Sequence, residues 1–439
     1  MQAPEYLAKF ETIQMQTLYH LLSLDDRERV FRLADDFRFT QQDLRRFVEF
    51  CLDFAMWNQE SPFSSWQRWH RASPLTGKAF KQYAFRRFEQ LVVALVDDGI
   101  QYDEIPELPT AYKKTKIKKS RPDEHKKIFG MCPVYSEKTL CCNLRTIDAV
   151  KNCGFGCSYC SIQTMFTGDE VFFDDGFTEK LQGIQLDPKR HYHIGTGQSS
   201  DALMWGNKNG ILDSMFEFAR KWPRALIEFK TKSKNIRYFL NRPVPENIVC
   251  SWSLNPDGVI ANEEHLTASM KERLDAARRV ADQGIKVAFH FHPMIYFSDW
   301  QQHYAELMQD IQCYFSPQEV LFVSFGTLTF PKPVLKKIRG NGIQSQILRM
   351  PMVANPEGKM TYPDDIKIKL FTFAFEQFQH WHERVFFYLC MEEKRHWLTA
   401  FGFDYENNDL FEQAFHRSVW AKITPGIQVN TSYRSNEKS

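Results

Sequence analysis

The chain has 439 residues, of which 43% are hydrophobic and 25% charged, a globular composition that excludes a disordered or fibrous protein. The formal net charge of +2 gives no general attraction to nucleic acid, so such a partner would need a local basic patch. No apolar run of about 18 residues and no secretory signal is found, and ten cysteines are too few for a disulfide scaffold. We therefore expect a cytoplasmic protein without a membrane span, whose thiols are reduced or bound to metal.

Residues 1–105 are predicted to form a helical domain. Apolar residues recur three and four positions apart in three stretches, 24–37, 40–57 and 78–99. Asp25 or Thr40 would cap a helix at its N-terminus, and Gly99 would close the third one.

Residues 106–145 are predicted to be a basic linker or arm. The segment 106–127 is punctuated by proline and rich in lysine and arginine. This pattern fits an exposed charged connector and also a contact with nucleic acid, and both interpretations stay open.

From residue 146 to residue 335, strand patterns alternate with helical patterns. The strand candidates are 146–150, 191–195, 225–230, 247–254, 286–295 and 319–328. The helical stretches between them include 211–222, 270–284 and 300–315. Such alternation predicts an α/β fold with parallel strands, and six units fit a partial (β/α)6 barrel with active residues at the C-terminal strand ends. Residues 336–439 are predicted to be a C-terminal extension with one long amphipathic helix over about 365–395.

Three cysteines follow the first strand in the spacing C-x3-C-x2-C, at Cys153, Cys157 and Cys160. Two glycines in the first gap let the loop curl so that three thiolates can converge. Thiolates are the usual ligands of iron–sulfur clusters, and three of them leave one iron of a 4Fe–4S cluster open. The alternative is a zinc site with a fourth ligand from Cys132, Cys141 or Cys142, but the second ligand pair usual for zinc is missing after the motif.

With this motif, residues 146 to about 335 resemble the radical S-adenosylmethionine superfamily and, within it, the spore photoproduct lyase family. Ile162, Gln163 and Thr164 follow the cysteines, as a similar Leu/Ile-Gln-Thr stretch does in the family. The resemblance implies a lyase-class enzyme whose 4Fe–4S cluster splits S-adenosylmethionine reductively and releases a 5′-deoxyadenosyl radical. In the family this radical reverses a thymine dimer. The implied partners are a DNA or nucleotide substrate and a reductant such as flavodoxin or ferredoxin.

Three more segments resemble the family at the expected strand ends. GTGQSSDAL after the second strand is similar to a Cys-Thr-Ser-Asp segment, which implies that Ser200 and Asp201 contact the cofactor. A helix-capping turn is the alternative interpretation, and the two are compatible. FKTKS after the third strand implies Lys232 near the cofactor carboxylate, against an ordinary surface lysine. SWSLN at the fourth strand implies Ser253 and Asn255, which share one face of the strand, as further polar contacts.

The resemblance fails at two positions of the hydrogen-return pathway. The family's donor cysteine corresponds to Gln198, which has no S–H bond, and one of two tyrosines around the third cluster cysteine is replaced by Ser161. Tyr159 is retained and is the candidate for a radical-relay residue. Thymine-dimer reversal is therefore open even where the family resemblance holds.

Other thiols and two histidines are considered for the missing role. Cys250 is three residues from Ser253 and would face away from the barrel interior. Cys141 and Cys142 could take part only through a loop over the barrel mouth. His290 and His292 share one face of the fifth strand, as ordinary core histidines or as groups for proton transfer or substrate binding. The basic stretch 329–337 is read as an exposed turn or a phosphate-contacting loop.

Three functional hypotheses follow from these patterns. The first is a radical S-adenosylmethionine enzyme that acts on a nucleic acid or nucleotide. The second is a non-catalytic iron–sulfur protein that binds nucleic acid through its helical N-terminus and basic arm. The third is a zinc-stabilised α/β protein. Cofactor-binding residues at the later strand ends favour the first, because a structural cluster needs no cofactor pocket.

Overall fold

The computed structural model describes residues 3–102, 116–120, 127–132, 138–166, 170–240 and 242–424. Contacts divide the chain into two compact units, which are described separately. Unit 1 comprises 1–104, 158–164 and 329–361, and unit 2 comprises 105–157, 165–328 and 362–439. Most of the predicted basic arm at 106–127 lies outside the described residues. The division of the chain into four segments stays a prediction. In the structure, 329–361 groups with the N-terminal helices.

The described N-terminal part of unit 1 contains the α-helices α1 (Ala3–Gln14), α2 (Leu24–Asp36), α3 (Gln41–Met56), α4 (Pro62–Ala72) and α5 (Gly77–Asp97). The prediction of a helical N-terminus is confirmed. Thr40 caps α3 in a capping box with Asp43, as expected, but Ser23 rather than Asp25 caps α2. Buried aromatic rings such as Phe47, Trp66 and Phe88 pack edge to face in the interior of this unit.

The segment 329–361 adds further elements to unit 1. They are β13 (Thr329–Phe330), α12 (Lys332–Gly340), η4 (Ile347–Arg349), β14 (Val353–Ala354) and β15 (Met360–Thr361). Arg339 of α12 forms a two-point ion pair with the buried Asp53 of α3 at 2.7 and 2.8 Å. The basic stretch at 329–337 is therefore a short strand followed by a helix, not an exposed turn.

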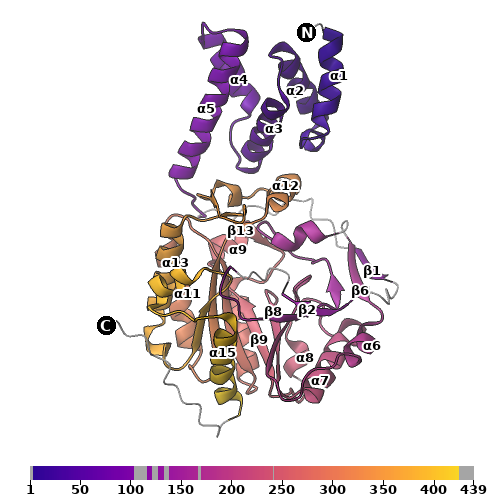
Figure 1. The fold of residues 1–439 in the computed structure, drawn as a ribbon, viewed down its shortest axis with the longest axis vertical. Helices are drawn as coiled ribbons and strands as arrows, with labels where there is room; N and C mark the ends of the chain where they lie inside the picture. Colours follow the sequence, from indigo (N-terminus) through magenta and orange to yellow (C-terminus); the bar gives the residue numbers. More distant parts are fainter. Residues whose placement is uncertain are drawn as a thin grey trace. The chain divides into compact units, whose positions relative to one another are not determined.

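Unit 2 is built on an eight-stranded sheet in the order β16-β12-β11-β9-β8-β7-β3-β2 (Figure 1). All neighbours are parallel except β2, which pairs antiparallel with β3. The strands are β2 (Phe129–Met131), β3 (Arg145–Ile147), β7 (Tyr192–Thr196), β8 (Ala225–Thr231), β9 (Ile248–Ser253), β11 (Lys286–Met294), β12 (Val320–Thr327) and β16 (Phe386–Leu389). A smaller sheet combines β1 (Lys116–Ser120), β6 (Glu170–Asp174) and β4 (Val150–Lys151). Five of the six predicted strands are confirmed, whereas the first, 146–150, is divided between β3 in the eight-stranded sheet and β4 in the smaller one.

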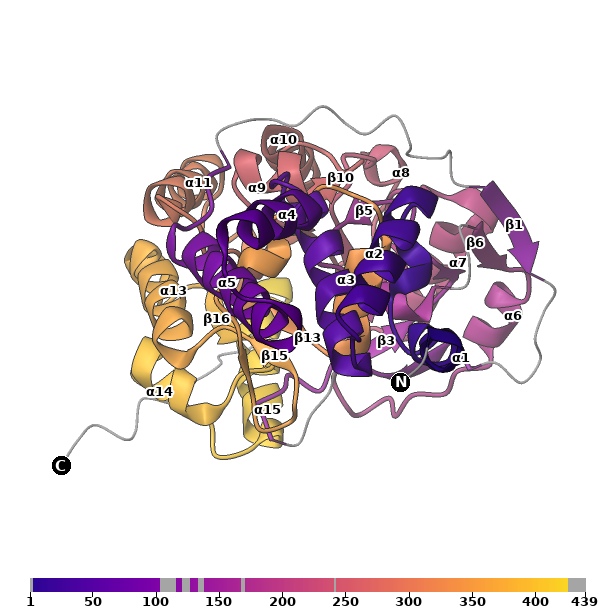
Figure 2. The ribbon, with the colours of Figure 1, turned by 90° about the horizontal axis from the view of Figure 1, so that it is seen from above.

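Helices cover the outer face of the curled sheet. They include α6 (Phe177–Gln182), α7 (Ile211–Lys221), α8 (Arg237–Leu240), α10 (Met270–Ala281), α11 (Trp300–Tyr314) and α13 (Asp364–Gln377). In the view from above, α10, α11 and α13 follow one another along this side (Figure 2). Phe229 points outward against Phe216 and Phe239, while Glu228 and Lys230 on either side of it point inward. The α/β class and the partial barrel are thus confirmed.

The single helix expected over about 365–395 is wrong. This region forms α13, the short η5 (Gln379–Trp381), β16 and α14 (Lys394–Phe401). The aromatic run at 386–389 pairs in parallel with β12, because the edge of β12 otherwise leaves its backbone hydrogen bonds unmade. The last helix, α15 (Asn408–Ile423), lies on the inner face, where Phe415 stacks on His193 and packs against Phe322. Among the described helices, none combines the length and apolar character that a membrane span requires.

Candidate functional site

The cysteine motif begins in a loop between β4 and β5 (Gly156–Cys157) that packs closely against the segment after β7. The Sγ of Cys153 lies 3.9 Å from the Sδ of Met204. A Cβ added to Gly154 would lie 2.6 Å from Met204 Cε and 3.1 Å from the ring of Trp205. Glycine at this position therefore allows the loop to approach Met204 and Trp205.

Ser199 fixes the start of this loop to the turn after β7. Its backbone N–H donates to Asp148 Oδ1 at 3.0 Å. Its hydroxyl lies 2.9 Å from the same oxygen and 2.6 Å from the carbonyl of Val150. The residues before the first cysteine are thus held against the turn that contains Ser200 and Asp201.

A buried carboxylate supports the end of the loop. β5 pairs antiparallel with β10 (Glu264–His265), so that Cys157 lies opposite Glu264. Glu264 is only 1% exposed. Its Oε2 lies 2.6 Å from the guanidinium of Arg273, and its Oε1 accepts from the amide of Asn255 at 2.8 Å and lies 3.5 Å from Lys232 Nζ. An arginine and a lysine are thus the cationic neighbours of this buried carboxylate.

Asp201 organises the turn between β7 and β8. Oδ1 accepts from the backbone N–H groups of Leu203 at 3.0 Å and Met204 at 2.9 Å and from the Thr231 hydroxyl at 2.7 Å, and Oδ2 accepts from the Lys232 N–H at 2.7 Å. Burial raises the pKa of Asp201, and these donors oppose the increase. Asp201 thus ties the end of β8 to the turn that follows β7. The expected helix cap is not formed, because α7 begins only at Ile211, after Gly210.

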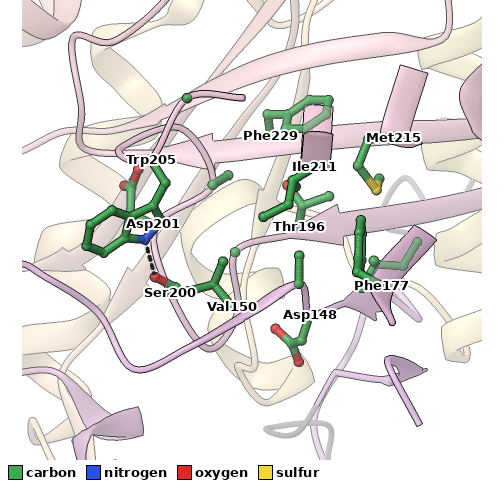
Figure 3. A pocket seen from close by; sticks show the side chains of 15 residues that line it. Asp148, Val150, Phe177, Thr196, Ser200, Asp201, Trp205, Ile211, Met215 and Phe229 are labelled. Carbon is green, nitrogen blue, oxygen red and sulfur yellow. Dashed lines mark hydrogen bonds between the residues drawn. The ribbon is translucent and has the colours of Figure 1, made fainter. Parts of the chain in front are cut away.

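A pocket lies on the outer side of this turn (Figure 3). Its lining combines apolar side chains from α6 and α7 with a polar rim that includes Asp148, Ser200 and Asp201. The indole N–H of Trp205 donates to Ser200 Oγ at 3.1 Å at its edge. Lys232 and the end of β9 do not line it, so this pocket by itself does not gather the predicted cofactor contacts.

Lys232 and Ser253 are brought together. The Lys232 ammonium, whose side chain is 14% exposed, donates to Ser253 Oγ at 2.6 Å. The Ser253 hydroxyl lies 3.2 Å from the carbonyl of His292. Asn255 is fully buried, and its side chain is engaged by Glu264 and by the Tyr304 hydroxyl at 2.6 Å. Asn255 is therefore a buried residue that positions its neighbours, whereas the Lys232 side chain is partly accessible to solvent.

Cys160 and Tyr159 belong to the segment 158–164, which groups with unit 1. Tyr159 is buried. In the same unit, Gln163 donates to the carbonyl of Ser158 at 3.2 Å and accepts from Asn341 at 2.6 Å. The role of each predicted site residue stays a prediction.

No three His, Cys, Asp or Glu side chains are gathered as a metal site within the described ranges. The three motif cysteines nevertheless retain accessible surface, and thiolates are the donors that iron–sulfur clusters use. The donor chemistry fits a cluster, and the ligand assignment rests on that chemistry and on the sequence spacing.

The sequence did not reveal the polar interior of the barrel. It identified His290 and His292, but not their hydrogen-bonded partners Glu228, Lys230 and Ser324. Polar residues at alternate positions of otherwise apolar strands were the available signal, since they must share the inner face. Cys250 is fully buried on β9 beside Phe229, on the outer face, as predicted.

Comparison with known proteins identifies the family that this region resembles. Residues 146–346 match the family model described as spore photoproduct lyase. The chain is 25% identical over 171 residues to a spore photoproduct lyase of Clostridium acetobutylicum, which covers 37% of this chain and 50% of the relative. It is 26% identical over 170 residues to one from a Geobacillus species, again covering 50% of that protein. The match spans about half the length of these curated relatives.

Solved structures agree at the level of the fold. A spore photoproduct lyase mutant with bound AdoMet and dinucleoside spore photoproduct superimposes with a TM-score of 0.51 at 19% identity, covering 69% of this chain and 93% of that chain. A second mutant gives a TM-score of 0.52 with the same identity and coverage. At such low identity, the agreement establishes the shared fold.

Proposed function

Because residues 146–346 form a spore photoproduct lyase-like domain of the radical S-adenosylmethionine superfamily, we propose that the chain is a radical enzyme. Cys153, Cys157 and Cys160 would hold a 4Fe–4S cluster. When bound, that cluster supplies one electron to S-adenosylmethionine, whose cleavage gives a 5′-deoxyadenosyl radical.

One observation carries this proposal: the cysteine loop and the predicted cofactor residues form a continuous assembly. Ser199 joins the start of the loop to the turn after β7, Asp201 joins that turn to Lys232, and Lys232 approaches Glu264 opposite Cys157. The assembly lies at the carboxyl ends of parallel strands, where α/β barrels place their active groups. A cluster with only a structural role would not need a lysine and a serine held at that edge.

In this proposal each polar residue has a separate task. The Lys232 ammonium binds a carboxylate of the cofactor, and its hydrogen bond to Ser253 fixes its direction. Ser200 supplies a hydroxyl at the turn, while Asp201 and Asn255 act by holding backbone and side chains in place. Tyr159 is proposed as a radical-relay residue.

The substrate is proposed from the named relatives. One solved relative is described with bound dinucleoside spore photoproduct, so a DNA pyrimidine lesion or a related nucleotide is the proposed substrate class here. A flavodoxin or ferredoxin is the proposed reductant, and the cytoplasm the proposed location. Gln198 and Ser161 stand where the family has a cysteine and a tyrosine, so the step after radical formation differs from that of the lyase.

The test is reconstitution of the full chain with iron and sulfide under anaerobic conditions, followed by reduction with dithionite. We expect 5′-deoxyadenosine to form from S-adenosylmethionine and the cluster's EPR spectrum to change when the cofactor is added. A cluster that forms without either effect would instead indicate the non-catalytic nucleic-acid-binding protein. Zinc in place of iron after anaerobic purification would indicate the zinc-stabilised protein.

A further inference from the structure

A buried carboxylate lies at the centre of the inner face of the sheet. Glu228 of β8 is 2% exposed, and its Oε2 lies 2.7 Å from His193 Nε2 on β7. Its Oε1 lies 2.6 Å from His290 Nε2 on β11 and accepts from the Ser251 hydroxyl of β9. Three neighbouring strands therefore each supply a donor to this carboxylate, which is a satisfied buried charge.

A chain of hydrogen bonds leads from this carboxylate to Lys230, two residues further along β8. His290 Nδ1 lies 2.6 Å from Ser324 Oγ, and Ser324 Oγ lies 3.0 Å from His292 Nε2. His292 Nδ1 lies 3.4 Å from Lys230 Nζ. A lysine ammonium can only donate, so Nδ1 of His292 accepts, and every later bond in the chain then runs toward Glu228.

The charges along this chain are separated. Burial and the nearby Lys230 lower the pKa of His290 to about 4 and hold that of His292 well below its ordinary value, so both rings are neutral at pH 7. Burial alone would raise the pKa of Glu228, but its contacts with His290 and His193 hold it well below the usual range. The chain of hydrogen bonds thus has a carboxylate at one end, two neutral imidazole rings in the middle and a lysine at the other end.

Lys230 is the incomplete end of the chain. In the part of the protein that the structure describes, its ammonium makes one long hydrogen bond, to His292, and no ion pair. Two of its three N–H donors consequently have no acceptor among the described residues. Burial lowers the pKa of Lys230, and the nearby Glu228 carboxylate opposes this decrease.

Solvent reaches the surroundings of Lys230. Lys230, His292 and Cys390 keep accessible surface although they lie on the inner side of the sheet. Gly326 of β12 leaves room for the His292 ring, since a Cβ there would lie 3.2 Å from it. The titratable groups that act on Lys230 come from several elements and are Glu228, Lys232, His292, Cys132 and Cys390.

We propose that Lys230 is a substrate-binding residue inside the barrel, whose two remaining N–H groups bind an oxygen acceptor of the substrate. His292, Ser324, His290 and Glu228 are positioning residues that orient the ammonium. The acceptor oxygen is either a pyrimidine carbonyl or a phosphate oxygen. This identification of the substrate class rests on the proposed function, whereas the presence of an oxygen-binding lysine does not.

Calorimetric titration of the reconstituted full chain tests the binding residue with two probes, dinucleoside spore photoproduct and inorganic phosphate. Lys230→Met should weaken at least one of them by about tenfold to a hundredfold, the loss expected for a charge-assisted hydrogen bond. Lys189→Met, an exposed lysine of the same unit, should leave both affinities unchanged. If affinity is lost for the dinucleoside, the oxygen that Lys230 binds is a base oxygen. If affinity is lost for phosphate alone, it is a phosphate oxygen. Equal affinities of Lys230→Met and the unsubstituted chain, or no binding of either probe, would overturn the proposal.

Two controls separate this proposal from its alternatives. Lys230→Arg keeps the charge and should retain most of the affinity if the effect of Lys230→Met is not a failure to fold. Iron content after reconstitution should be unchanged in Lys230→Met, because Lys230 is not one of the proposed cluster ligands. If the unsubstituted chain forms no 5′-deoxyadenosine, the proposed radical function fails, while the phosphate titration still tests Lys230.

The pH dependence of binding tests the positioning residues. Binding should be lost when Lys230 loses its proton. In Ser324→Ala this loss should occur at lower pH, because His292 no longer presents a fixed acceptor to the ammonium. Lys230→Arg should abolish the loss between pH 6 and 9, since arginine keeps its charge there. If the pH midpoint of binding is unchanged in Ser324→Ala, the chain of hydrogen bonds has only a structural role.

Discussion

Cys157 lies directly opposite Glu264 in the antiparallel pair of β5 and β10, so the cysteine motif is joined to a buried carboxylate more than a hundred residues away in sequence. The same carboxylate contacts Arg273, Asn255 and Lys232. Glu264 therefore connects the loop with the proposed cluster ligands to the sheet edge with the proposed cofactor contacts. Substitutions of the buried residues around Glu264 should affect the loop and the edge together.

Replacing Cys157 with alanine should abolish cluster binding, because two thiolates cannot hold the cluster that three are proposed to hold. The measurement is iron and sulfide content after reconstitution, together with the EPR signal of the reduced protein. Cys313→Ala removes an exposed thiol of α11 and should leave both unchanged. Equal iron content in the two variants would show that Cys157 is not a ligand.

Replacing Arg273 with methionine should destabilise unit 2 by about 3–5 kcal/mol, because it removes one partner of a buried ion pair and leaves Glu264 behind. Arg273 also donates to the carbonyls of Ser253 and Ala268. Arg279→Met, an exposed position on the same helix, should change the free energy of unfolding by less than about 0.5 kcal/mol. Denaturant unfolding followed by circular dichroism compares the two, and similar midpoints would contradict the structural role of Arg273.

Glycine at position 197 is required by two independent constraints. Its φ is +83°, and a Cβ would lie 2.7 Å from both Ala202 N and Ser200 O. Gly197→Ala should therefore cost more than about 2 kcal/mol and weaken S-adenosylmethionine binding, since the backbone around Ser200 must shift. Gly284→Ala, with φ +77° and open space around it, should cost only about 1 kcal/mol. If Gly197→Ala and Gly284→Ala lower the free energy of unfolding equally, the turn after β7 can relax to accept a side chain.

Stability should fall as the pH decreases from about 6.5 to 4. The unfolded chain binds a proton at His290 below about pH 6.5, whereas the folded chain, in which that pKa is lowered to about 4, does not. The free energy of unfolding should then decline by up to about 1.4 kcal/mol per pH unit for this group. Chemical unfolding at pH 7.5, 6 and 5 measures the slope.

The variant His290→Asn should flatten this slope, because asparagine does not titrate. His20→Asn removes an exposed histidine of unit 1 and serves as the matched control. A slope that is the same in all three proteins would show that the acid sensitivity arises elsewhere, for example at His292, whose pKa is also lowered.

The sequence by itself determined the strands, their parallel arrangement and the cysteine motif. Each of these follows from local signals: apolar runs such as 320–327, helical periodicity between them, and the fixed spacing of three thiols. Residues 386–389 form a strand instead of part of the expected helix. A short aromatic run is compatible with both, and only the unpaired edge of β12 decides between them.

Tertiary structure alone decided which polar residues meet. No local pattern pairs Glu264 with Cys157 or connects Lys230 to Glu228 through His292, Ser324 and His290. These contacts join different strands, and strand order and register fix which side chains share the inner face at one level. The cysteines could thus be found from their spacing, whereas the lysine inside the barrel required the folded sheet.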